Sequence, residues 1–350
     1  MHIPDGYLSP TTAVVLYGAA APFWWRASRV VKRLLTGQTV PLLALFSAFC
    51  FTVMMFNIPV PGGTTAHAVG GTLAAIVLGP WPAIIAVSVA LIIQAIFFGD
   101  GGITAIGANC FNMAIVLPLV GYGVYRLLAR NAAVPSRRRV IAAAIGSYVG
   151  INVAGLLVGI ELGIQPIFWS QNGHALYAPY SLSVAIPAML IPHLTLAGAA
   201  EAIATAFGVA YVQRVQPQLL LRGPSGAAGG EARAPAPAHG RLIITAAIAV
   251  VMLVAVPLGL LAGGSAWGEW DPSELGGNVG YVPSGLQRLH GVWSAPLSGY
   301  SLPWIPAGAP FAEQAVGYIL SAVVGAGLIL IAAFAVRILA RRRAASASGG

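Results

Sequence analysis

The sequence is poor in charged residues. Only 8% of its 350 side chains are Asp, Glu, Lys or Arg, whereas 58% are hydrophobic. Water-soluble domains carry about 25% charged residues, so this composition excludes an ordinary soluble protein. The uncharged runs 40–57 and 242–262 are long enough to cross a hydrocarbon core about 30 Å thick. The sequence therefore predicts a multi-pass membrane protein.

Cysteine and the common catalytic motifs are almost or entirely lacking. Cys50 and Cys110 form no CxxC pair and lie in or beside hydrophobic runs, so we interpret them as small buried residues rather than metal ligands. The sequence has no GxxxxGK[ST] phosphate-binding loop, no GxSxG and no HExxH. These absences argue against an enzyme and against an ATPase within this chain.

Hydrophobic runs predict nine membrane spans. They lie near residues 9–31, 40–57, 69–79, 82–98, 107–129, 140–162, 180–212, 242–262 and 314–338. The third and fourth run together, but Pro80 and Pro82 lie in their middle, where proline removes a hydrogen-bond donor and clashes with the preceding turn. We therefore expect the helix to break there.

The distribution of Lys and Arg favours that break. With it, 17 of the 18 basic residues fall on one side of the membrane and only Arg288 falls on the other. The positive-inside rule then places the N-terminus outside and the C-terminus in the cytoplasm. The predicted fold is an all-α membrane bundle of about seven spans, followed by two further spans. The net charge of +9 then reflects cytoplasmic loops, not a nucleic-acid partner.

The composition also divides the chain. Residues 216–241 are mostly rich in Gly, Ala and Pro and predict a flexible cytoplasmic linker. The linker separates a unit over 1–215 from a two-span module over 242–350, whose two spans flank an external loop at 263–313.

The first two residues form a potential metal chelate. The α-amine of Met1, the amide nitrogen of His2 and the Nδ1 atom of His2 can bind one ion in a five-membered and a six-membered ring. His67 lies in an external loop by the topology above and can supply a fourth nitrogen. A planar field of four nitrogens suits Cu(II) or Ni(II) better than Zn(II). Spacing alone leaves open that the pattern is accidental.

Other polar residues have plainer interpretations. His193 and Glu201 lie eight residues apart on one helical face, and they suggest either an interhelical polar contact or a role in gating or subunit contact. We expect Glu161 to be solvated near the external face. Asn109 and Asn112 predict interhelical amide bonds after an external turn.

Three motifs resemble the CbiM/NikM family. They are MHIPDGYLSP at 1–10, FNIPVPGGTTAHAVGGTLAAIVLGPW at 56–81 and IIQAIFFGDGGITAIGANCFNM at 92–113. The resemblance covers about residues 1–215. Members of that family are the substrate-capture components of energy-coupling-factor transporters, ATP-driven importers for cobalt and nickel that supply metal, for example, to cobalamin biosynthesis.

The resemblance implies a site and partners. It implies that Co(II) or Ni(II) is bound as substrate by the Met1 amine, the His2 amide and imidazole nitrogens, and the His67 imidazole, with no organic cofactor. Asp5, Asn57 and Thr65 are then candidates for holding these ligands in place. Implied partners are a CbiQ/NikQ-like coupling subunit in the membrane and CbiO/NikO-like cytoplasmic ATPases. The implied location is a bacterial or archaeal plasma (inner) membrane.

The C-terminal module resembles the small auxiliary CbiN/NikN component, or its PDGLE-type relative, fused in frame. The segment APLSGYSLPWI at 295–305 carries this resemblance, although WDPSELGG at 270–277 and VPSGLQRL at 282–289 are the nearest strings to PDGLE. The alternative function is a stand-alone secondary transporter or channel for a divalent metal, since Gly/Pro-interrupted spans also occur in those folds.

Overall fold

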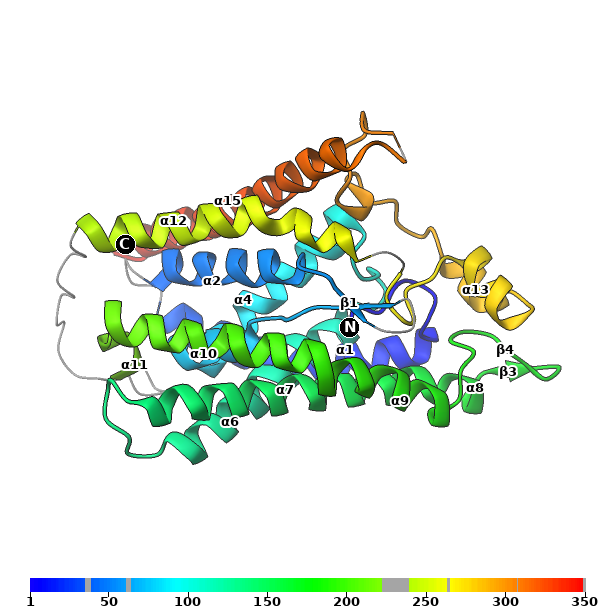
Figure 1. The fold of residues 1–350 in the computed structure, drawn as a ribbon, viewed down its shortest axis with the longest axis horizontal. Helices are drawn as coiled ribbons and strands as arrows, with labels where there is room; N and C mark the ends of the chain where they lie inside the picture. Colours follow the sequence, from blue (N-terminus) through cyan, green and yellow to red (C-terminus); the bar gives the residue numbers. More distant parts are fainter. Residues whose placement is uncertain (35–38, 61–63, 222–238, 263–264, 307, 349–350) are drawn as a thin grey trace.

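Long hydrophobic helices run roughly along one axis of the molecule (Figure 1). The structure is a computed structural model that describes residues 1–34, 39–60, 64–221, 239–262, 265–306 and 308–348. Within these, five helical segments are long and hydrophobic enough to cross a membrane. They are Pro80–Phe98, Ile106–Ala129, Arg137–Phe168, Leu182–Val215 and Phe311–Ala335. The predicted class, a helical multi-pass membrane protein, is confirmed.

The first helices begin where the sequence provides a start signal. Helix α1 (Pro10–Arg33) starts at a proline, and the hydroxyl of Ser9 accepts a hydrogen bond from Thr12 N. Serine at this position satisfies a free N–H group of the first turn. Helix α2 (Thr39–Met54) follows.

The helix break near Pro80 is present, but the expected span over 69–79 is wrong. Helix α3 (Gly71–Leu78) has eight residues, about 12 Å of length, and cannot cross a membrane. It is separated from α4 (Pro80–Ile93) by Gly79, whose φ of 90° favours glycine. Before α3, the antiparallel strands β1 (Ile58–Val60) and β2 (Thr64–Ala66) lie within the bundle (Figure 1).

Several long helices contain π-helical segments. Helix α4 continues as η1 (Gln94–Phe98). Segments α5 (Ile106–Asn109), η2 (Cys110–Val116) and α6 (Leu117–Ala129) follow one another directly, as do α9 (Leu182–Pro192), η3 (His193–Ala197) and α10 (Gly198–Val215). π-Helical turns are frequent at functional sites, and η1 and η3 begin at polar residues discussed below.

Small residues let the central helices approach closely. Helix α7 (Arg137–Gly163) packs on α6 so tightly that a Cβ at Gly150 would lie 2.6 Å from the carbonyl oxygen of Leu117. A Cβ at Gly146 would lie 2.5 Å from the carbonyl oxygen of Gly121. This packing of small residues is typical of membrane helices.

Shorter elements connect these helices at the two ends of the bundle. They are α8 (Gln165–Phe168), the paired strands β3 (Ser170–Gln171) and β4 (His174–Ala175), and α11 (Gln218–Leu221). Helix α11 lies in the segment predicted as a linker, and residues 222–238 of that segment lie outside the described residues.

The C-terminal module packs against the first unit. It contains α12 (His239–Ala255), η4 (Val256–Leu261), α13 (Pro272–Val279), α14 (Ser284–Leu289), η5 (Ser298–Tyr300) and α15 (Phe311–Ser348). Helix α15 lies along α2, where a Cβ at Gly325 would meet the ring of Phe51 at 2.1 Å. The segment between η4 and α15 folds over the bundle end near the N-terminus: Trp293 Nε1 donates to Ile96 O at 2.7 Å.

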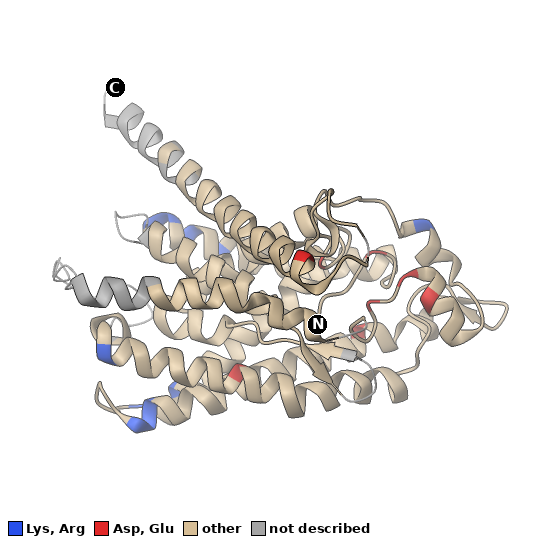
Figure 2. Cartoon of the chain, turned by 45° about the horizontal axis from the view of Figure 1, so that its top comes forward, with Lys and Arg blue, Asp and Glu red and all other residues tan. Residues whose placement is uncertain are grey.

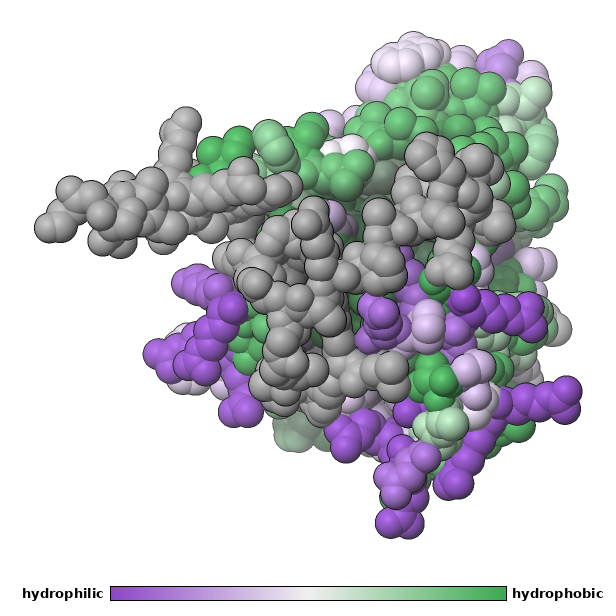
Figure 3. Space-filling model, turned by 90° about the vertical axis from the view of Figure 1, so that its left-hand side faces the viewer, coloured by the Kyte–Doolittle hydropathy of each residue, from purple (hydrophilic) through white to green (hydrophobic). Residues whose placement is uncertain are grey.

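Charge is distributed unequally between the two ends. Lys and Arg residues gather at the end where α1, α6 and α10 finish and α7 begins, whereas most Asp and Glu residues lie toward the other end (Figure 2). Figure 3 views the basic end and shows hydrophilic side chains over its lower part. The two ends of the helical bundle therefore differ in charge.

Candidate metal centre

The N-terminal residues are buried inside the bundle. Met1 and His2 are only 5% and 4% exposed. Ile3 N donates to Asn109 Oδ1 at 2.8 Å, and Ile3 O accepts from Asn109 Nδ2 at 3.1 Å. Ile3 O also accepts from Gly102 N at 2.9 Å. Chain termini are usually exposed and mobile, whereas these three hydrogen bonds fix the third residue inside the bundle.

Asp5 fixes the same segment from its other side. Its carboxylate accepts from Ile103 N at 3.2 Å, from Thr104 N at 2.8 Å and from the Thr104 hydroxyl. A Cβ at Gly102 would lie 2.3 Å from Asp5 N, so only glycine fits there. Asp5 therefore holds the N-terminal segment against the loop before α5.

His2 and His67 lie side by side. Nδ1 of His2 is 3.2 Å from Nε2 of His67, and both residues are buried. His67 Nδ1 donates to Ala68 O at 3.1 Å, because a carbonyl oxygen only accepts. His2 Nε2 faces Gln94 Oε1 at 3.4 Å. With those two nitrogens carrying the protons, the two nitrogens that face each other carry lone pairs.

A carboxylate completes this group of acceptors. Asp100 Oδ1 lies 3.0 Å from His2 Nδ1. Asp100 Oδ2 accepts from the Tyr300 hydroxyl at 2.5 Å and from Gln94 Nε2 at 3.4 Å, and Gln94 Nε2 also donates to Tyr300 at 2.9 Å. Acceptors that face one another without a proton between them repel, and a cation placed among them relieves that repulsion.

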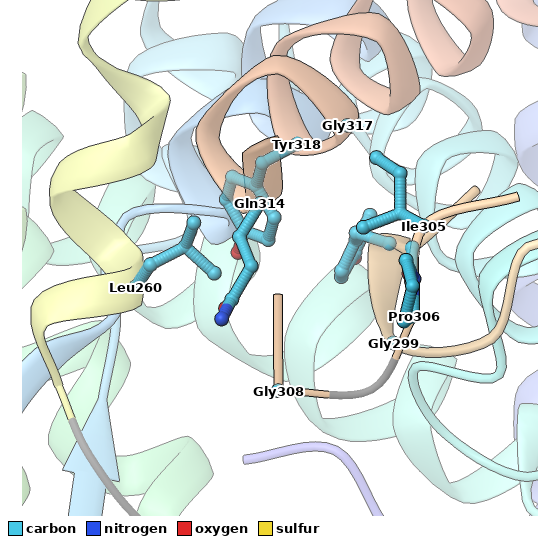
Figure 4. Close-up of a pocket in the computed structure, with 10 residues that line it drawn as sticks. Leu260, Gly299, Ile305, Pro306, Gly308, Gln314, Gly317 and Tyr318 are labelled. Atoms are coloured by element: carbon cyan, nitrogen blue, oxygen red, sulfur yellow. The ribbon is translucent and has the colours of Figure 1, made fainter. Parts of the chain in front are cut away.

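The site has a polar contact with the C-terminal module. The Met1 amine lies 3.7 Å from Glu269 Oε1. Tyr7 also donates to Trp270 O at 2.8 Å. Tyr300, which donates to Asp100, also lines a cavity of about 110 Å³. Figure 4 shows this cavity between Leu260, Ile305 and Tyr318. Two residues of the second unit, Glu269 and Tyr300, therefore stand beside the residues of the first.

Burial keeps the imidazoles neutral. Burial and then the nearby Met1 amine lower the pKa of His2 to about 3. The same two causes lower the pKa of His67 well below its usual value. Burial raises the pKa of Asp100 and raises that of Glu269 to about 7. Neutral imidazoles are the form that binds metals.

Side chains alone do not make a complete site. Among the described residues, no group of three or more His, Cys, Asp or Glu side chains is arranged to hold a metal ion. Two imidazoles leave most ligand positions of an ion unfilled. The main-chain amine and amide of Met1 and His2 are the further nitrogen donors at this place.

The other predicted residues lie at varying distances from this group. Thr65 is buried on β2 opposite Pro59, two residues before His67. Asn57 lies just before β1, and no hydrogen bond joins its side chain to the three ligand candidates within the described part of the chain. Asn57 therefore lacks the contact expected of it.

His193 and Glu201 make separate contacts. His193 Nδ1 donates to Met189 O at 2.6 Å, within its own helix. Glu201 Oε2 accepts from Val69 N at 2.7 Å and from Gly70 N at 2.9 Å. Glu201 thus makes an interhelical polar contact, whereas His193 bonds locally.

Glu161 corrects an expectation. It is only 7% exposed and accepts from Asn112 Nδ2 at 2.8 Å, so the prediction that it is solvated is wrong. Asn112 does form an interhelical bond, but Asn109 binds the N-terminal backbone instead.

Comparison with known families follows the same division of the chain. Residues 2–219 match the family of the cobalt uptake substrate-specific transmembrane region, CbiM. The chain belongs to the CbiM family. Residues 241–342 match the PDGLE domain, which confirms the resemblance predicted for the C-terminal module although the string itself is absent.

Two relatives named as fused transport proteins align with nearly the whole chain. The chain is 50% identical over 346 residues to the fused nickel transport protein NikMN of Rhodobacter capsulatus, covering 94% of this chain and 95% of that protein. It is 42% identical over 343 residues to the probable fused nickel transport protein LarMN of Lactiplantibacillus plantarum, covering 95% and 96%. A crystal structure of a truncated transition metal transporter is 53% identical, with a TM-score of 0.58, over 61% of this chain and 99% of that one.

Proposed function

We propose that this CbiM-family chain is the substrate-binding membrane component of an ATP-driven importer for Ni(II) or Co(II). One observation carries the proposal: the lone-pair nitrogens of His2 and His67 face each other at 3.2 Å, beside the terminal amine. Donors at right angles around an ion with bonds of about 2 Å lie about 3 Å apart. The names of the two fused relatives favour nickel.

In this proposal, four nitrogens bind the ion. Met1 contributes its amine, His2 its amide nitrogen and Nδ1, and His67 its Nε2. Planar coordination by nitrogen suits Ni(II), and the site disfavours Zn(II), which prefers a tetrahedron. Asp100 and Glu269 place carboxyl oxygens beside the nitrogen donors.

The proposal also includes a route and partners. The N-terminus faces outside, and the metal approaches from the cavity beyond Tyr300. This chain has no phosphate-binding loop of its own, so the ATPases are separate, CbiO/NikO-like subunits. They bind, together with a CbiQ/NikQ-like coupling subunit, at the basic end of the bundle, which the positive-inside rule assigns to the cytoplasm. ATP hydrolysis in those partners then opens the site inward.

Moving the terminal amine tests the proposal. We expect one alanine added before Met1 to abolish nickel uptake in cells that carry the partner subunits, because the amine leaves the chelate. His67→Ala should lower uptake similarly, while the amount of protein in the membrane stays unchanged. Normal uptake by the extended protein, with the added residue verified by mass spectrometry, would contradict the proposed site.

A further inference from the structure

Glu201 is a fully buried carboxylate whose hydrogen bonds reach the segment that follows His67. It lies on α10 with 0% exposure. Its Oε2 atom accepts from the backbone N–H groups of Val69, at 2.7 Å, and Gly70, at 2.9 Å. These are the second and third residues after His67. Away from solvent, losing this acceptor would leave both N–H groups unsatisfied, which is costly.

One peptide unit joins Glu201 to the His67 ring. The carbonyl oxygen of Ala68 accepts from His67 Nδ1, and the N–H of Val69 donates to Glu201. These two groups are the two ends of the same planar peptide. Rotating that peptide away from Glu201 therefore also rotates the acceptor that orients the imidazole and keeps its Nε2 free of a proton.

The neighbouring backbone has little freedom to compensate. Gly70 has a φ of 77°, and a Cβ there would lie 2.6 Å from Phe49 Cε1. Gly71 is similarly close to Leu117. The Glu201 carboxyl group also lies at the N-terminus of α3, where backbone N–H groups lack partners within the helix. The Glu201 carboxyl group and these close contacts together fix the position of the segment from His67 to Gly71.

We propose that Glu201 is a positioning residue for the candidate metal centre, holding the Ala68–Val69 peptide so that Nε2 of His67 points at the ion. This inference rests on the proposed function. Helix α10 is thereby connected to a metal ligand through Glu201 and one peptide group. Since α10 extends toward the basic end of the bundle, a shift of α10 there also moves His67.

The test is a Ni(II) titration of the purified full-length chain, with the absorption spectrum of the bound metal recorded. We expect Glu201→Gln to weaken Ni(II) binding about 10- to 100-fold, as for other residues that orient metal ligands. Its spectrum should shift toward that of His67→Ala. Glu201→Ala should bind more weakly still, because glutamine retains an oxygen acceptor for the two N–H groups and alanine has none.

Glu161→Gln is the matched control, because it replaces another buried carboxyl group, one that contacts Asn112 rather than the His67 segment. It should keep the wild-type affinity and spectrum. The inference is overturned if Glu201→Gln, folded by its thermal midpoint without metal, binds Ni(II) like the wild type. It is also overturned if Glu161→Gln changes the spectrum equally. If His67→Ala also leaves Ni(II) binding and the spectrum unchanged, the proposed metal site itself is wrong. If only Glu201→Gln is without effect, the site stands and the role of Glu201 is wrong.

Discussion

Main-chain atoms and a few buried polar side chains form the candidate site. Asn109 contacts both the N–H and the carbonyl of Ile3, and Ile3 N belongs to the same peptide as the His2 carbonyl. The position of the chelate therefore depends on an amide side chain about 106 residues away in sequence. This dependence predicts the effect of removing the amide.

Asn109→Ala should weaken Ni(II) binding by about 10- to 100-fold, since residues that orient metal ligands have effects of this size. Isothermal titration of the purified protein measures it. Asn152→Ala removes another membrane-helix amide, whose Nδ2 donates to Tyr148 O at 2.8 Å, and should leave binding unchanged. Equal losses in the two variants would show a general packing defect instead.

Metal affinity should rise with pH. The metal-bound state carries fewer protons, because the Met1 amine and His2 amide must lose theirs. The imidazoles contribute little above pH 6, since burial lowers the pKa of His2 to about 3 and that of His67 well below its usual value. Calorimetry in buffers of different ionisation enthalpy should count about two protons released per ion at most. A count near four would mean that both imidazoles are protonated in the free protein.

The sequence singled out Met1, His2 and His67 because their donors form a recognisable chelate. It did not identify Gln94, Asp100, Asn109, Glu269 or Tyr300 as neighbours of that chelate. Their placement depends on how distant elements pack, which no local pattern encodes. Gln94 offered one signal, because an amide within a long hydrophobic run requires a buried partner.

At the scale of elements, glycine decides where helices stop and how closely they pack. The break before α4 was predictable from Pro80 and Pro82. That a short hairpin and an eight-residue helix precede the break was not predictable. The β1–β2 hairpin and α3 together return the chain toward the basic end (Figure 1), so the predicted sidedness of the arginine clusters does not depend on a full span there.

Gly325→Ala should loosen the contact between α15 and α2, because a Cβ at this position would meet the Phe51 ring at 2.1 Å. Overpacking of this kind costs about 1–3 kcal/mol. A lower thermal midpoint of the purified protein checks it. Gly327→Ala is the control on the same helix, since a Cβ there meets nothing within 4 Å. Unchanged stability in Gly325→Ala would contradict this packing.

At the scale of the whole molecule, residues of both units meet at the candidate metal centre. Glu269 and Tyr300 of the PDGLE-type module stand beside Met1 and Asp100 of the CbiM unit. The Gly/Ala/Pro-rich segment predicts a division into two units, but the segment itself says nothing about which of their surfaces meet, so their close packing was not predictable.

Purified chain reconstituted alone into vesicles should bind nickel without accumulating it. Accumulation should require co-reconstituted coupling and ATPase subunits and ATP, because the chain has no phosphate-binding loop. Vesicles loaded with a metal-sensitive dye measure this. Protein-free vesicles control for leakage. Accumulation by the chain alone, driven by an ion gradient, would instead support the secondary transporter.

The central claim is that four nitrogens from Met1, His2 and His67 bind the transported ion. X-ray absorption spectroscopy of nickel bound to the purified protein tests it most directly. We expect the bound nickel to have four nitrogen donors in a plane, two of them imidazoles. In His67→Ala, the bound nickel should have one imidazole donor fewer. Six-coordinate nickel bound mainly by oxygen, with a spectrum unaffected by His67→Ala, would contradict it.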